Sequence, residues 1–111
     1  MFSSRIEDVS FAVKKAVSKV DENAKIILFG SRARGVFNED SDWDFLILTD
    51  KEITSDLQDE IRAYIYDLEL DIGQVITSII ENRGVWEEYQ VSEFYKNVEK
   101  DGIEILLPTA A

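Results

Sequence analysis

The sequence contains no cysteine and only one proline, Pro108. Without cysteine, the chain can form neither a disulfide scaffold nor a thiol redox centre. The longest apolar run, residues 26–29, is far shorter than the roughly 20 apolar residues that cross a membrane. Nothing near the first residue has the pattern of a signal peptide. We therefore expect a cytoplasmic protein that does not associate with membranes.

Basic residues are also scarce, with 12 lysines and arginines against 23 acidic residues and a net charge of −11. A protein that grips a nucleic-acid backbone needs several Lys or Arg side chains per site to displace counterions. Here the basic groupings are Arg32 with Arg34 and Lys14 with Lys15. An acidic surface also keeps small proteins soluble without any further role. The charge nevertheless predicts that nucleic acid is not a partner.

The chain has 111 residues, of which 45% are hydrophobic, so residues 1–111 are expected to form a single domain with a real core. Apolar periodicity and capping pairs predict most of its elements. The first half is expected to contain a helix over 4–20 capped by Ser4 and Glu7, a strand over 25–29, a turn and short helix over 30–35, and a strand over 43–48.

The second half is expected to begin with a helix from residue 55, capped by Ser55 and Gln58. A strand over 70–77 interrupted by Gly73, a short amphipathic segment within 79–90, a helix over 92–101, a strand over 103–107 and a frayed tail over 109–111 follow. Gly102 is expected to stop the last helix in a left-handed conformation. This order predicts an α/β fold (α+β, two-layer), with helices packed against a small sheet.

A candidate phosphate-binding turn follows the first strand, in the sequence Gly30-Ser31-Arg32-Ala33-Arg34. Backbone N–H groups at the start of a helix attract anions, and a glycine allows a ligand to approach closely. The Ser31 hydroxyl can donate a hydrogen bond, and Arg32 or Arg34 can pair with phosphate oxygens. By itself, the segment also fits an ordinary strand-to-helix turn with two solvated arginines.

Asp42 and Asp44 form a candidate catalytic and metal-binding pair at the start of the second strand. Because side chains alternate along a strand, both carboxylates should face the same side, with Trp43 and Phe45 on the other. Aspartate is unfavourable in strands, yet Asp44 lies within an apolar run. A solvated acidic strand edge is the alternative interpretation.

Asp71 is the candidate third carboxylate, in the predicted strand Leu-Asp-Ile-Gly-Gln-Val-Ile. If that strand is next to the second one, Asp71 can face Asp42 and Asp44. Three neighbouring carboxylates repel one another, and a bound cation would relieve the repulsion. Asp67 and Glu69 compete for the same role.

These blocks together resemble the minimal nucleotidyltransferases of the DNA polymerase β superfamily. The resemblance rests on Gly30-Ser31, ten intervening residues, Asp42-Trp43-Asp44, and the later strand with Asp71. It implies a nucleotidyltransferase fold with a small mixed sheet, two Mg²⁺ ions, and ATP as substrate. Asp42 and Asp44 would hold both ions, and Asp71 would bind the ion that activates the acceptor. Trp43 and Gly73 are less typical of these proteins.

The resemblance also implies a partner. Small members of this kind are commonly paired with a HEPN-domain toxin, and some transfer AMP to a tyrosine hydroxyl of that toxin. We therefore expect a metal-dependent protein adenylyltransferase that acts as a type VII-like antitoxin and can form an oligomer. Two alternatives remain: a binding module that neutralises its partner by occlusion, and an aminoglycoside-type enzyme that modifies a small-molecule hydroxyl.

Overall fold

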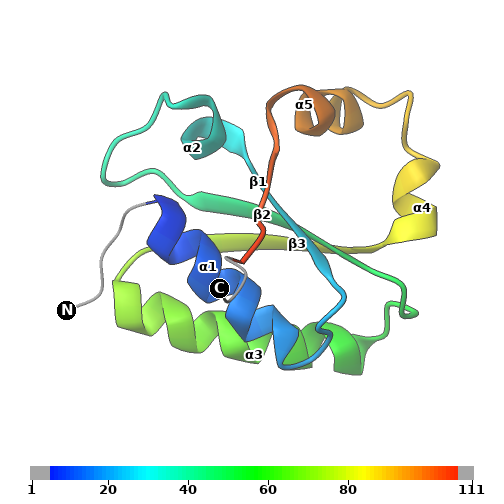
Figure 1. Ribbon diagram of the computed structural model, residues 1–111, viewed down its shortest axis with the longest axis horizontal. Coiled ribbons are helices and arrows are strands. Elements are labelled where there is room, and N and C mark those ends of the chain that lie inside the picture. Colours follow the sequence, from blue (N-terminus) through cyan, green and yellow to red (C-terminus); the bar gives the residue numbers. More distant parts are fainter. Residues whose placement is uncertain (1–5, 108–111) are drawn as a thin grey trace.

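A computed structural model describes residues 6–107, which form a four-stranded sheet with helices on both sides (Figure 1). The elements are α1 (Ile6–Ser18), β1 (Lys25–Phe29), α2 (Gly30–Arg34), β2 (Trp43–Thr49), α3 (Ser55–Ile72), β3 (Ile76–Asn82), α4 (Arg83–Glu87), α5 (Glu93–Asp101) and β4 (Ile103–Glu104). The sheet order is β3-β2-β1-β4, and only β2 and β3 run parallel. The predicted α/β fold with a small mixed sheet is confirmed.

One face of the sheet is covered by α1 and α3, which lie side by side. Each helix turns one apolar stripe inward, because its apolar residues recur at helical spacing. This core contains Val9, Val13 and Val17 from α1, Leu57, Ile61, Ile65 and Leu68 from α3, and Trp43, Phe45 and Ile47 from β2. Full burial of one such side chain stabilises the fold by about 1.5–3 kcal/mol.

The opposite face carries a second, smaller cluster, where Leu46 and Leu48 of β2 pack with Trp86 of α4 and Val98 of α5. Residues of β2 therefore alternate between the two cores, as the period of a strand requires. By the same alternation, Asp44 belongs to the face of Leu46, away from α1 and α3.

The predicted strand over 70–77 is wrong. Helix α3 continues through Ile72, four residues after the buried Leu68, and ends at Gly73. Gly73 is left-handed, with φ 68°, and its N–H donates to the carbonyl oxygen of Glu69. It is the C-cap of a helix, a role that glycine fills because it lacks a Cβ. The third strand begins only at Ile76 and ends at Asn82, inside the segment over 79–90 that was expected to be amphipathic.

Two predicted helix ends also differ from the structure. Thr54, not Ser55, caps α3, since its side chain accepts a hydrogen bond from the Leu57 N–H. Gly102 has φ −66° and is extended, so the predicted left-handed stop is wrong. A Cβ at Gly102 would lie 2.8 Å from Ile27 Cγ2, so this glycine allows close packing. The predicted cap at Ser4 and the tail over 109–111 lie outside the described residues.

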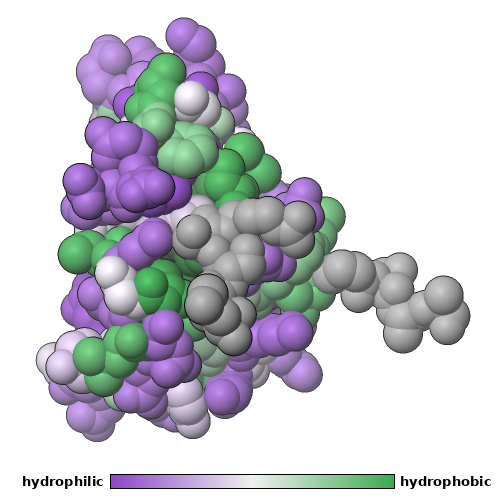
Figure 2. Space-filling view, turned by 90° about the vertical axis from the view of Figure 1, so that its left-hand side faces the viewer, coloured by the Kyte–Doolittle hydropathy of each residue, from purple (hydrophilic) through white to green (hydrophobic). Residues whose placement is uncertain are grey.

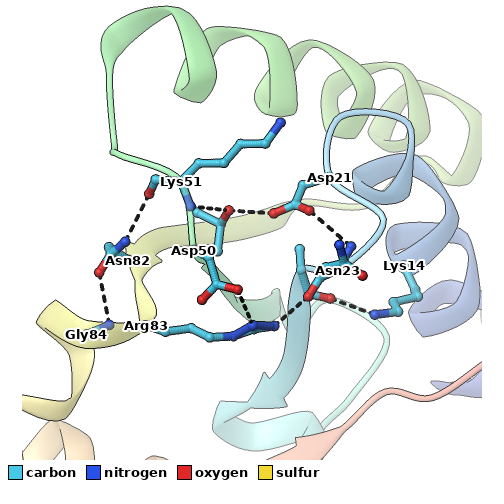
Figure 3. Close-up of polar contacts among 10 residues, drawn as sticks. Lys14, Asp21, Asn23, Asp50, Lys51, Asn82, Arg83 and Gly84 are labelled. Atoms are coloured by element: carbon cyan, nitrogen blue, oxygen red, sulfur yellow. Dashed lines mark hydrogen bonds and ion pairs between the residues drawn. The ribbon is translucent and has the colours of Figure 1, made fainter.

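A polar network joins the segments that follow α1, β2 and β3 (Figure 3). The Thr49 hydroxyl donates to the Asp21 carboxylate and accepts from the Lys51 N–H, while Arg83 pairs with Asp50. Thr49 is at the last position of β2, so the network lies at the other end of that strand from Asp44. Among residues 6–107, no helix combines the length and apolarity that a membrane crossing requires.

Candidate active site

The candidate site forms where β1 ends and β2 begins. These strands are antiparallel, and their register places Phe29 beside Asp44. Gly30 follows Phe29 directly and opens α2. The predicted Gly30-Ser31 turn and the predicted Asp42–Asp44 pair are therefore brought together by strand pairing, although they are a dozen residues apart in the sequence.

The Asp44 carboxylate lies against the Cα of Gly30. A Cβ built on Gly30 would be 2.3 Å from Asp44 Oδ2, a distance that real side chains do not tolerate. Gly30 also has φ +75°, a left-handed conformation that disfavours residues with a Cβ. Two independent constraints, space and backbone conformation, therefore require glycine at this position.

Asp44 is half-buried, whereas Asp42 is exposed. Burial raises the pKa of Asp44, the neighbouring Asp42 charge raises it further, and Arg34 lowers it. The two carboxylates thus lie close enough to repel each other, as predicted from their spacing. A repelled pair of carboxylates favours a bound cation, because the cation offsets both charges.

Arg32 does not face this carboxylate pair. It is only 4% exposed, and its guanidinium carbon lies over the rings of Trp43 and Phe37, 4.0 Å and 4.8 Å from their centroids. Its Nε and Nη2 both donate to the Ser41 carbonyl oxygen, at 3.1 and 2.9 Å. The predicted phosphate-binding role of Arg32 therefore conflicts with its placement, since its donors hold the segment before β2.

Arg34 is the arginine that lies near Asp44. It is exposed and lines a pocket of about 210 Å³ together with Gly30 and residues of α5, among them Phe94 and Asn97. Ser31 is half-buried in the first turn of α2, next to Gly30. Gly30, Ser31 and Arg34 thus stay together, and the sequence had not indicated that α5 borders them.

The surface around α2 is mixed in character. Figure 2 looks onto the side where α2 and the segment after it lie, and it shows apolar patches within a mostly hydrophilic surface. Val36 and Phe37, directly after α2, are 67% and 43% exposed.

The prediction that Asp71 faces Asp42 and Asp44 is wrong. Asp71 lies in the last turn of α3, in a layer that packs on the opposite face of the sheet from Asp44. It lines a groove between α1 and α3 together with Asp67 and Lys15. Of its two apolar neighbours in the sequence, Ile72 packs against the core and Leu70 is exposed. A short window of apolar residues does not distinguish such a helix end from a strand.

The described residues do not form the two-ion, three-carboxylate site predicted from the sequence. Asp42 and Asp44 offer hard oxygen ligands, which suit Mg²⁺. Within residues 6–107, no group of three His, Cys, Asp or Glu side chains could hold a metal ion.

Comparison with known proteins agrees with this geometry. The nucleotidyltransferase domain family matches residues 12–105, a span that includes α2, both aspartates and all four strands. The chain belongs to the nucleotidyltransferase domain family. The match supports an enzyme that transfers a nucleotidyl group.

One relative is a protein of Methanocaldococcus jannaschii that is described as a candidate protein adenylyltransferase. The two are 37% identical over 78 residues, which cover 70% of this chain and 73% of the relative. A crystal structure from Sulfolobus solfataricus, described as a candidate nucleotidyltransferase, shares the fold with a TM-score of 0.54. It has 22% identity, and the match covers 86% of this chain and 78% of that one.

Proposed function

We propose that this nucleotidyltransferase transfers AMP from ATP to a hydroxyl group of a protein partner, and that a HEPN-domain toxin is the partner. The observation that carries the proposal is the Asp44 carboxylate held against Gly30, with Asp42 and Arg34 beside it. The name of the Methanocaldococcus jannaschii relative supports a protein as the acceptor. This chain would then be the antitoxin, and the modified hydroxyl would silence the toxin.

The reaction is a displacement at the α-phosphorus of ATP. The acceptor oxygen forms a bond to this phosphorus, the bond to the bridging oxygen of the β-phosphate breaks, and pyrophosphate leaves. The proton of the acceptor hydroxyl is released. Positioning and charge neutralisation dominate such a transfer, because little covalent chemistry is required of the protein.

The residues of the site have separate tasks. Asp42 and Asp44 would hold Mg²⁺, which when bound neutralises the triphosphate and polarises the α-phosphate. Gly30 leaves room for the phosphates to approach the backbone, and the Ser31 hydroxyl would donate to a phosphate oxygen. Arg34 would pair with the β- or γ-phosphate, because it is the arginine near Asp44.

The pocket between α2 and α5 is the natural place for the nucleoside. It borders Gly30 and Arg34, and the residues that line it include Phe94 and Asn97. An aromatic ring can pack on a base, and an amide can donate and accept hydrogen bonds at its edge.

Transfer of radiolabelled AMP from ATP to a co-purified HEPN-domain protein tests the proposal. The double variant Asp42→Asn with Asp44→Asn should lose transfer while still binding the partner. Asp71→Asn is the matched control, since it removes a carboxylate on the other side of the sheet and should leave transfer unchanged. Full transfer by the double variant would overturn the assignment of the site.

A second candidate function is neutralisation of the partner by binding alone. The placement of Asp71 favours it, because the site has two of the three carboxylates expected from the sequence. The same experiment distinguishes the two functions: binding alone predicts that the wild-type chain inhibits its partner without labelling it.

A further inference from the structure

The strand next to the acidic pair presents a threonine where a third carboxylate would have to stand. β2 and β3 are parallel, and their register places Thr77 beside Asp44. Their neighbours show which face these residues share. Trp43 pairs with Ile76 in the core beneath α1 and α3, and Leu46 pairs with Ile79 in the cluster on the opposite face.

Because side chains alternate along both strands, Thr77 and Asp44 lie on the same face of the sheet. Adjacent strands are about 4.8 Å apart. A carboxylate at position 77 could therefore share a cation with Asp44, and the uncharged threonine hydroxyl offers neither a negative charge nor a base of useful strength. Thr77 is exposed, so nothing in the core dictates its identity.

Within residues 6–107, no other acidic residue completes a group of three possible metal ligands. Glu81, the next acidic residue of β3, pairs with Leu48, which is four residues, or roughly 13 Å, farther along the strand than Asp44. Asp71 is in the layer beyond the sheet.

We propose that this site takes one divalent cation together with the nucleoside triphosphate, and that Thr77 leaves the acceptor-side metal position without a ligand from residues 6–107. This inference rests on the proposed function. The chain's own residues then bind and orient the nucleotide, whereas the proton of the acceptor hydroxyl leaves to water or to a group of the acceptor molecule.

Counting Mn²⁺ ions tests the inference. The full chain is saturated with Mn²⁺ and α,β-methylene-ATP, which does not react, and bound ions are counted by equilibrium dialysis and paramagnetic resonance. The wild type should hold one ion per chain, and Thr77→Asp should hold two with a spin-coupled spectrum, because paired ions lie about 3.5–4 Å apart. Thr77→Asn, which has the shape of the aspartate without its charge, should hold one.

The outcomes separate the two proposals. Two coupled ions in the wild type would overturn the one-cation inference and leave the proposed function intact. No nucleotide-dependent ion in the wild type would contradict the proposed function and this inference with it. If Thr77→Asp fails to fold, the number of Mn²⁺ ions bound per wild-type chain still tests the one-cation inference. As a second readout, Thr77→Asp should accelerate AMP transfer on the order of 100-fold, the effect of a positioned base.

Discussion

Gly30 and Asp44 are in direct contact across the β1–β2 pair, and the space between them leaves no room for a methyl group. This contact joins the turn after β1 to the acidic start of β2. A substitution at Gly30 should therefore change the position of the Asp44 carboxylate, and a substitution at Asp44 should change the space next to Gly30.

Gly30→Ala should abolish the rise in melting temperature that Mg-ATP causes. The added Cβ must displace the Asp44 carboxylate, and the left-handed backbone adds about 1–2 kcal/mol of strain. Gly35→Ala is the matched control, because Gly35 has φ +76° but nothing within 4 Å of its built Cβ. Both variants should melt at a lower temperature than the wild type, yet only Gly35→Ala should still respond to Mg-ATP.

For the wild type, saturating Mg-ATP at about 100 times Kd should add roughly 2.7 kcal/mol to stability. Each kcal/mol raises the melting temperature by about 4–8 °C in a domain of this size. Removal of the metal with a chelator should cancel the shift. Identical melting curves with and without millimolar Mg-ATP would contradict a nucleotide site.

The two arginines of α2 should separate in their effects. Arg32→Met should destabilise the fold by about 1.5–3 kcal/mol, because it removes two charged donors from the half-buried carbonyl oxygen of Ser41. Arg34→Met should change stability little, since Arg34 is exposed, but should weaken ATP binding. Urea unfolding and a calorimetric titration measure the two properties. These roles would be reversed if a folded Arg32→Met variant bound ATP more weakly than the wild type while Arg34→Met bound it equally well.

Asp44→Asn should raise the melting temperature of the metal-free protein at pH 7. A raised pKa means that the fold favours protonated Asp44, so its contribution to stability is complete below the unfolded value of 3.8 and is lost as pH rises through the folded value. The difference between variant and wild type should therefore close below pH 3.8. A lower melting temperature for Asp44→Asn at pH 7 would indicate a structural carboxylate instead.

Asp21 should show the opposite pH dependence. Burial raises its pKa, but hydrogen bonds from the Thr49 hydroxyl and the Asn23 N–H, together with the charges of Lys51 and Arg83, outweigh this and hold the pKa below 3.8. Its contribution is thus present above pH 3.8 and is lost as pH falls through the folded value. Asp21→Asn should destabilise the protein at pH 7, and this difference should shrink at lower pH. Thr49→Val should cost about 1 kcal/mol at pH 7.

Local patterns in the sequence were sufficient for much of the fold and part of the site. The strand over 25–29 matches β1, and the helix predicted over 92–101 matches α5, for which Ser92 is the N-cap. The pairing of Asp42 with Asp44 follows from the two-residue period of a strand, which needs no tertiary information. The Gly30-Ser31 turn and the order of the blocks were sufficient to indicate the family.

Local patterns did not predict which other residues lie near Asp44. That depends on which strands pair and in which register, and both are properties of tertiary packing. Leu68 and Ile72 extend a helical stripe, but a window around Asp71 reads equally well as a short apolar strand. The register of β2 and β3, set by burial of Trp43 with Ile76, decided that Thr77 and not Asp71 stands beside Asp44. Likewise, only the packing of Arg32 against Trp43 showed that its charge is used to hold a loop. A one-residue change in register moves every side chain of a strand to the other face, so the composition of this site was decided by long-range contacts.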